Sequence, residues 1–251
     1  MRMLLLVLFF ITTPLMAAEP VSKDEVLKVA RETKTKIESI SGYQFLLVKR
    51  ELVDGKDTGY QYLDVKVRTE PLGIYVKFLK PAKYAGREAL YYKDAQYGTD
   101  ELVVRRGGTR MANMVLHITP ESVLAMDGNR YPITHMNPKV LANELMTKIE
   151  KELAFPETEL QAYRQAKLEG QPGTMYTMTH TEKKEGMECL RAEVMICHKL
   201  GVPIYFRVYD FEKRTVEYYG FLKMQLNPEF TPDEFDERNP EYGFAKEDGQ
   251  N

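Results

Sequence analysis

The chain has 251 residues, of which 43% are hydrophobic and 29% charged, so it can bury a substantial core. Its 35 basic and 37 acidic residues are interspersed, which argues against nucleic-acid binding because that function needs a clustered basic face. No linker-like stretch divides the chain, and we therefore expect a single domain over residues 19–243 followed by a flexible tail at 244–251.

The first eighteen residues predict export. Arg2 supplies a positive charge, residues 3–11 form an unbroken apolar run, and Ala17 and Ala18 precede the polar Glu19. This order is typical of a secretory signal peptide, and the run is shorter than the roughly 20 residues that cross a bilayer. We expect a soluble periplasmic protein with no membrane span after cleavage. A buried N-terminal helix or a retained anchor is the alternative.

The next segment is predicted to be a helix that ends at Gly42. Ser22 with Glu25 three residues later forms a capping box. Apolar and small residues then recur near helical spacing at Val26, Leu27, Ala30, Thr33, Ile37 and Ile40.

From residue 43 the apolar period changes to two, which predicts strands at 43–52, 60–70, 74–78, 87–93, 101–106 and 113–118. Along 60–70 one face carries Leu63, Val65 and Val67, and along 74–78 one face carries Ile74, Val76 and Phe78. Turn residues every 8–12 positions favour an antiparallel meander.

Two helical segments are expected in the middle of the chain. The first is short and covers residues 120–126. The second begins at Asn137, an N-cap residue followed by Pro138, and carries an apolar stripe at Leu141, Leu145, Ile149 and Leu153. This stripe indicates a helix packed on the sheet, with a partner-binding helix as the alternative.

Strand patterns return at 162–168, 175–181, 188–196, 202–211 and 214–222. We expect inward faces formed by Val194 with Leu190, Ala192 and Ile196, by Ile204, Phe206 and Val208, and by Val216, Tyr218 and Leu222, with Glu217 facing outward. The fold class is therefore predicted to be α+β, a strongly curved antiparallel sheet or open half-barrel whose concave apolar face is covered by helices. Its interior is either packed side chains or a ligand cavity.

The two cysteines, Cys189 and Cys197, lie in one strand-like segment. Eight strand steps separate them by roughly 26 Å, whereas a disulfide requires alpha carbons within about 7 Å. We expect both thiols to be unpaired and at least partly exposed.

No catalytic or metal-binding motif is present. The chain lacks a Gly-x-Ser-x-Gly elbow, a His-Glu-x-x-His helix, a phosphate loop and a dinucleotide fingerprint, and its four histidines are scattered. We therefore predict no catalytic residues, no metal site and no cofactor. If the protein were an envelope hydrolase, the first residues to consider would be Arg87, Glu88, His117 and His135.

Several stretches together resemble the DUF1571 family of exported bacterial proteins of unknown function, among them Val48-Lys49-Arg50-Glu51, Asp54-Gly55-Lys56, Tyr75-Val76-Lys77-Phe78-Leu79, Gly86-Arg87-Glu88, Leu124-Ala125-Met126-Asp127-Gly128-Asn129-Arg130 and Asn239-Pro240-Glu241-Tyr242. More distantly, the pattern is similar to the lipoprotein-carrier class, the LolA- and LolB-like proteins. That similarity implies a curved sheet that holds a helical lid over an apolar cavity.

The leading hypothesis is a periplasmic protein that binds an acyl chain, lipid or lipoprotein in an apolar cavity. The candidate lining residues are Leu63, Val65, Val67, Ile74, Val76, Phe78, Val194, Ile204, Phe206 and Val208, which could instead form a filled core. An envelope hydrolase and an envelope assembly or structural protein are the alternatives, and any protein partner is left open.

Overall fold

The computed structural model describes residues 18–93, 100–107 and 114–245, so the predicted signal peptide lies outside these residues except for Ala18. The strands are β1 (Glu19–Pro20), β2 (Gly42–Val53), β3 (Lys56–Asp57), β4 (Gln61–Thr69), β5 (Leu72–Lys80), β6 (Glu88–Lys93), β7 (Asp100–Arg105), β8 (Val115–Ile118), β9 (Glu159–Leu168), β10 (Gln171–Thr179), β11 (Arg191–Cys197), β12 (Pro203–Tyr209) and β13 (Thr215–Leu226). The α-helices are α1 (Lys23–Glu38), α2 (Val123–Met126) and α3 (Pro138–Leu153), and the 3-10 helices are η1 (Ile133–Met136), η2 (Pro232–Phe235) and η3 (Gly243–Ala245).

The described strands form one antiparallel sheet in the order β1-β9-β10-β11-β12-β13-β2-β4-β5-β6-β7-β8, with β3 paired to β2. The sheet is open, because β1 and β8 are its two edges and do not pair with each other. Most neighbours are consecutive in sequence, but β13 lies beside β2 and joins the two halves of the chain. The predicted α+β fold with an open, curved antiparallel sheet is confirmed.

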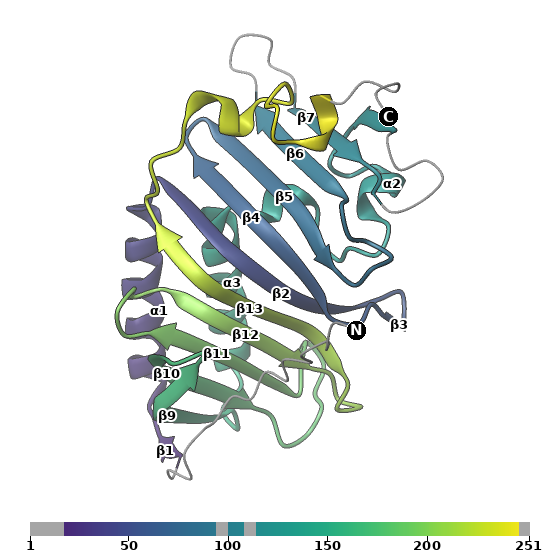
Figure 1. Ribbon diagram of the computed structural model, residues 1–251. Helices are drawn as coiled ribbons and strands as arrows, with labels where there is room; N and C mark the ends of the chain where they lie inside the picture. The colour runs from purple at the N-terminus through teal and green to yellow at the C-terminus, as the bar shows by residue number, and fades with distance from the viewer. Residues whose placement is uncertain (1–17, 94–99, 108–113, 246–251) are drawn as a thin grey trace, which may run out of the picture.

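Irregular pairings bend the sheet. The register shifts between Leu222 and Gln225 where β13 meets β2, and Lys223 there has a φ of 53°. A second shift lies between Val208 and Tyr209 where β12 meets β13. Bulges of this kind increase local twist and curvature, which lets the sheet wrap around the helices on one side (Figure 1).

Both long helices lie behind the sheet in the view of Figure 1 and begin at the predicted caps. The Ser22 hydroxyl accepts a hydrogen bond from the Glu25 backbone N–H at 3.1 Å, which starts α1. The Asn137 side chain accepts from the Lys139 backbone N–H at 3.0 Å, which starts α3. These helices cover the inner face of the sheet.

The C-terminal segment covers part of the opposite, outer face (Figure 1). Tyr242 stacks on Tyr75 of β5 with ring centroids 3.8 Å apart, and Phe235 joins the same cluster. Phe244, which we assigned to the tail, is only 9% exposed and lies in this cluster as well. The packed domain therefore extends past residue 243.

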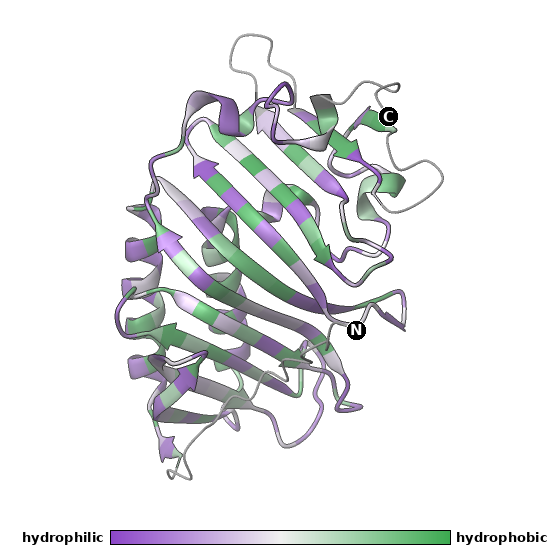
Figure 2. Ribbon diagram, viewed as in Figure 1, coloured by the Kyte–Doolittle hydropathy of each residue, from purple (hydrophilic) through white to green (hydrophobic). Residues whose placement is uncertain are grey.

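The outer face of β9–β13 also carries a packed apolar cluster, which includes Met195, Ile204 and Tyr205. Tyr218 and Leu222 belong to it, so the prediction that they face inward is wrong. Aromatic residues occupy both faces of β13, and the alternation of Tyr218 with Tyr219 could not distinguish the two sides. Figure 2 shows hydrophobic residues on neighbouring strands throughout this half of the sheet.

Both cysteines are unpaired, and both are buried rather than partly exposed as predicted. Cys197 ends β11 within the outer cluster, whereas Cys189 precedes that strand and lines a cavity on the inner side. Burial raises the pKa of the Cys189 thiol to about 12.

Candidate functional site: a two-lobed cavity

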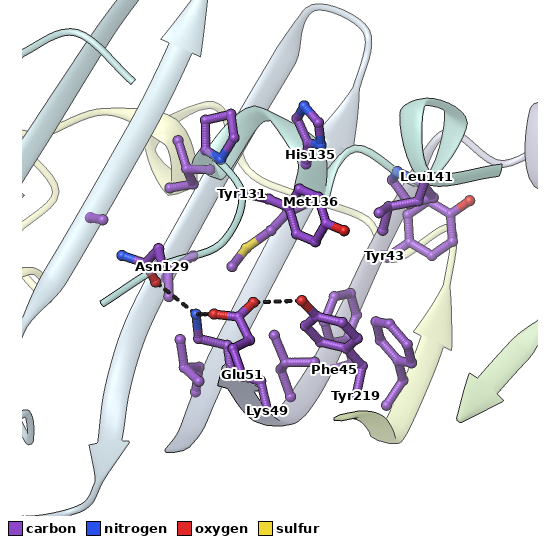
Figure 3. A pocket seen from close by; sticks show the side chains of 18 of the residues that line it. Tyr43, Phe45, Lys49, Glu51, Asn129, Tyr131, His135, Met136, Leu141 and Tyr219 are labelled. Atoms are coloured by element: carbon purple, nitrogen blue, oxygen red, sulfur yellow. Dashed lines mark hydrogen bonds and ion pairs between the residues drawn. The ribbon is translucent and has the colours of Figure 1, made fainter. Parts of the chain in front are cut away.

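A cavity of about 290 Å³, the large lobe, lies between the inner face of the sheet and the segment that runs from α2 through η1 to α3. Its walls are mostly apolar and include Phe45, Leu47, Leu102, Met136, Leu141 and Phe221. Figure 3 shows aromatic rings from the strands facing η1 and α3 across this space.

A second cavity of about 160 Å³, the small lobe, lies between α1, α3 and strands β10–β13. Its apolar walls include Val29, Ala30, Met146, Met178, Ala192 and Ile196. Several residues line both lobes, among them Leu145, Phe206 and the charged Lys148 and Glu217. The two lobes are therefore neighbours that share a wall.

The structure divides the ten predicted lining residues into five groups. Leu63, Val76 and Phe78 line the large lobe, Val194 and Phe206 line both lobes, and Val208 lines the small lobe. Val65, Val67 and Ile74 are fully buried in the core of β4 and β5. Ile204 is apart from all of these, in the cluster on the outer face.

Ile204 differs from the prediction because β12 is irregular at its start. The register against β11 shifts between Met195 and Ile196, so Pro203 pairs with Ile196 and Tyr205 with Met195. Ile204 is the extra residue in this irregular pairing, so its side chain does not share the inward face of Phe206.

A buried polar cluster stands at one end of the large lobe (Figure 3). Lys49 and Glu51 of β2 have side chains that are 4% and 3% exposed, and their charged atoms lie 2.9 Å apart. The Lys49 ammonium also donates to the Asn129 side-chain oxygen at 2.6 Å, and the Tyr219 hydroxyl donates to Glu51 at 2.5 Å. These bonds tie the segment after α2 to the sheet.

Glu217 of β13 continues this cluster, since it pairs directly across from Glu51 in the sheet. Two carboxylates that face each other repel and need compensation. Tyr131 donates to Glu217 at 2.7 Å, and the Arg130 guanidinium lies 2.9 Å from the same carboxylate. Lys148 of α3 donates to the Tyr131 hydroxyl at 3.3 Å.

These surroundings shift the pKa values of the polar groups. Burial, reinforced by Glu51, raises the pKa of Tyr219 well above its ordinary value, so this phenol stays protonated. Burial disfavours the charged form of Lys148, but Glu217, Tyr131 and Glu188 together outweigh it and raise the pKa of Lys148. Lys148 therefore remains a cation at the cavity wall.

The four residues named for a hydrolase do not gather in one cleft. Arg87, Glu88 and His135 line the large lobe, and His135 lies 3.4 Å from Glu144. His117 is on the edge strand β8, where its ring nitrogens lie 2.5 Å from Glu101 and 3.4 Å from Glu237. In the described part of the chain, no group of three or more His, Cys, Asp or Glu side chains could hold a metal ion.

Sequence reasoning missed the polar cluster, although one signal was present. Lys49 and Glu51 are in phase with the apolar Phe45 and Leu47 on β2, so charges continue the apolar face. Such residues are buried charges that need partners from elsewhere in the chain. Glu217 gave no such signal, because its face of β13 was assigned to solvent.

The fold and the cavity define an open-sheet α+β protein with an internal apolar chamber. The family model DUF1571, described as a protein of unknown function, matches residues 40–244. The chain belongs to this family, and the resemblance predicted from its motifs is confirmed.

Solved structures with a similar arrangement include three bacterial proteins. Mycobacterium tuberculosis lipoprotein LppX is 14% identical with a TM-score of 0.48, and the match covers 84% of this chain and 99% of that one. A putative outer membrane lipoprotein-sorting protein domain from Vibrio parahaemolyticus is 10% identical, with a TM-score of 0.41 and coverage of 86% and 98%. A LolA superfamily protein from Nitrosomonas europaea is 12% identical, with a TM-score of 0.32 and coverage of 85% and 96%.

No curated protein sequence matches the chain. Among the described residues, no helix has both the length and the apolar character needed to cross a membrane.

Proposed function

We propose that this protein is exported to the periplasm and there binds an acyl chain, a lipid or the acyl part of a lipoprotein in its two-lobed cavity. The hypothesis assigns no catalytic residue and no cofactor. It explains why an apolar interior of this size is kept open between the sheet and its helices.

One observation carries the proposal: apolar side chains inside the molecule keep part of their surface unpacked, facing the cavity. Phe78, Phe206, Val208 and Phe221 are only partly buried, although they lie between the sheet and the helices. Protein interiors are normally close-packed, and a dry apolar cavity readily accepts an apolar ligand. The exposed surface of these side chains is therefore available to a hydrocarbon chain.

The binding energy would come from transfer of the chain out of water. Each buried methylene contributes about 0.8 kcal/mol, so a chain of several methylenes binds well without any specific polar contact. The polar cluster around Lys49 and Glu51 then provides hydrogen-bonding groups near the ligand's polar end.

Export is supported by the N-terminal sequence alone, through Arg2, the apolar run 3–11 and the alanines before Glu19. The intact mass of the secreted protein tests this part. We expect a mature chain that begins near Glu19 and fractionates with the periplasm, and an uncleaved cytosolic chain would refute it.

Native mass spectrometry of the purified protein and titration with an apolar fluorescent probe test the binding. We expect co-purified lipid, and saturable probe binding after delipidation. Ala142 lines both lobes, so an Ala142→Trp variant should fill part of each lobe and lose most of the probe binding. Asn143→Trp, at the neighbouring exposed position of α3, is the matched control and should bind normally. A wild-type protein that carries no lipid and binds no probe would refute the proposal.

A further inference from the structure

The residues shared by the two lobes are of two kinds, apolar and charged. Leu145, Val194 and Phe206 line both lobes, and so do Lys148 and Glu217. The Phe206 ring stacks on Tyr219 with centroids 6.3 Å apart and an interplanar angle of 18°, which holds it in place. A ligand that occupies both lobes would therefore contact these shared residues, Lys148 and Glu217 among them.

The two charged residues that line both lobes, Lys148 and Glu217, differ in how many partners their charged groups have. Glu217 accepts from Tyr131 and is paired with Arg130. Lys148 donates to the Tyr131 hydroxyl, and no ion pair holds it among the residues that the structure describes. An ammonium group has three donors, so Lys148 retains donors for a ligand. The wall shared by the two lobes therefore favours a group rich in hydrogen-bond acceptors.

We propose that the cavity holds a lipid with two hydrocarbon chains, one in each lobe, joined by an acceptor-rich polar linkage that binds Lys148. This inference rests on the proposed function and adds the number of chains and the position of the linkage. One long chain running through both lobes would place methylenes against the Lys148 cation, which is unfavourable because a partly buried charge needs a polar partner. The lobes of about 290 and 160 Å³ predict chains that are buried to different extents.

Binding stoichiometry on the delipidated mature protein tests the number of chains. Native mass spectrometry with decanol, a single chain, should show two molecules bound per protein. Didecanoylglycerol, which links two chains of matched length, should bind once and displace both decanol molecules. A protein that binds one decanol molecule supports the proposed function and overturns the two-chain inference. A protein that binds neither compound overturns both.

Filling each lobe separately gives a second test. Ala192 lines the small lobe alone and Ala89 the large lobe alone, so each Ala→Phe change occupies one lobe. Each variant should retain one decanol molecule and lose at least tenfold in affinity for didecanoylglycerol. Ala82→Phe, at an exposed position outside both lobes, is the control. If folded Ala192→Phe or Ala89→Phe protein keeps wild-type stoichiometry, the inference is wrong.

The role of Lys148 is tested by Lys148→Met, with Lys151→Met at an exposed position of the same helix as the control. Loss of one charge-assisted hydrogen bond should lower the affinity for didecanoylglycerol about tenfold and leave the number of bound decanol molecules unchanged. Didecanoylphosphatidylglycerol, which adds a phosphate to the same two chains, identifies the acceptor. If Lys148→Met lowers the affinity for both lipids equally, the contact is with the ester linkage. If it lowers the affinity for the phospholipid alone, the contact is with the phosphate. If the affinity for neither lipid falls, Lys148 does not bind the linkage.

Discussion

The strands β4 and β5 on one side of the molecule and β11 and β12 on the other carry similar apolar alternation but are packed differently. Val65, Val67 and Ile74 have no exposed surface at all. On the other side, Val194, Phe206 and Val208 also face inward but are only partly buried. The stretch of β4 and β5 around Val65 and Ile74 is therefore filled core, although other residues of these two strands line the large lobe. The inner face of β11 and β12 is instead the wall of a cavity.

The difference arises from what lies opposite each face. Residues of β4 and β5 belong to a cluster with Ile37, Phe45 and Tyr91, which closes around them. Residues of β11 and β12 face α3, whose stripe residues Leu145 and Ile149 are themselves only half-buried. A period of two thus identifies the apolar face of a strand, whereas the partner element decides whether that face is packed.

The largest effect should come from truncation in the filled region. Ile74→Ala removes a fully buried side chain and leaves a cavity, so the free energy of unfolding should fall by about 2–5 kcal/mol. Urea unfolding measures this loss. A loss of less than about 1 kcal/mol would show that β5 is no better packed than β12, and would remove the contrast.

A smaller loss is expected from Phe206→Ala in the hollow region. Phenylalanine truncation in a filled core costs about 3–5 kcal/mol, in part because it creates a cavity. At Phe206 the cavity already exists, so we expect a loss of about 1–2 kcal/mol together with altered affinity for an apolar probe. A full core-like loss with unchanged probe binding would mean that this wall is packed.

On the outer face of β9–β13, the packed cluster around Tyr218 should make the stability of the protein depend on pH. Burial is the main cause that raises the pKa of Tyr218 from 10.0 to about 12, and the neighbouring Tyr60 is a smaller one. Between these values the unfolded chain loses the phenolic proton and the folded chain keeps it, so the free energy of unfolding should fall as the pH rises from 10 to 12. Urea unfolding at pH 9 and pH 11 tests this, and Tyr218→Phe should show the weaker dependence. Equal pH dependence of both proteins would show that Tyr218 is not the cause.

The smallest effect is a difference in reactivity between the two cysteines. Cys189 lines the small lobe, whereas Cys197 has no exposed surface. With a small thiol reagent at pH 8, the folded protein should react slowly at Cys189, because its pKa is about 12, and not at Cys197. A bound ligand should slow Cys189 further. Both should label in denaturant without reductant, and failure there would mean that the thiols are paired.

Much of the fold could be predicted because its signals are local. The caps Ser22 and Asn137 place the starts of both long helices correctly, although the first helix ends at Glu38 and not at Gly42. The period of two identifies every described strand longer than two residues. Turn residues between successive strands predict the two meanders. The pairing of β13 with β2 could not be predicted, since no local pattern specifies which distant strand lies beside another.

The candidate site was only partly predictable for the same reason. Alternation placed Phe78, Val194, Phe206 and Val208 on inner faces, and the structure puts them at the cavity walls. The polar cluster depends on contacts such as Tyr219 with Glu51, which are 168 residues apart. Whether an inward face is filled or hollow is likewise a property of the assembled molecule, not of one strand.

The pairing of β2 with β13 also has a consequence for the order of folding. The two strands at the centre of the sheet come from opposite ends of the domain, so neither meander can be joined to the other until the last long strand has emerged. Such non-local pairing slows folding, because a long loop must close before its contacts form. A chain that folds from its N-terminus would thus remain two unfinished half-sheets until β13 arrives. Because β13 lines both lobes, the walls of the chamber would be completed only in that final step.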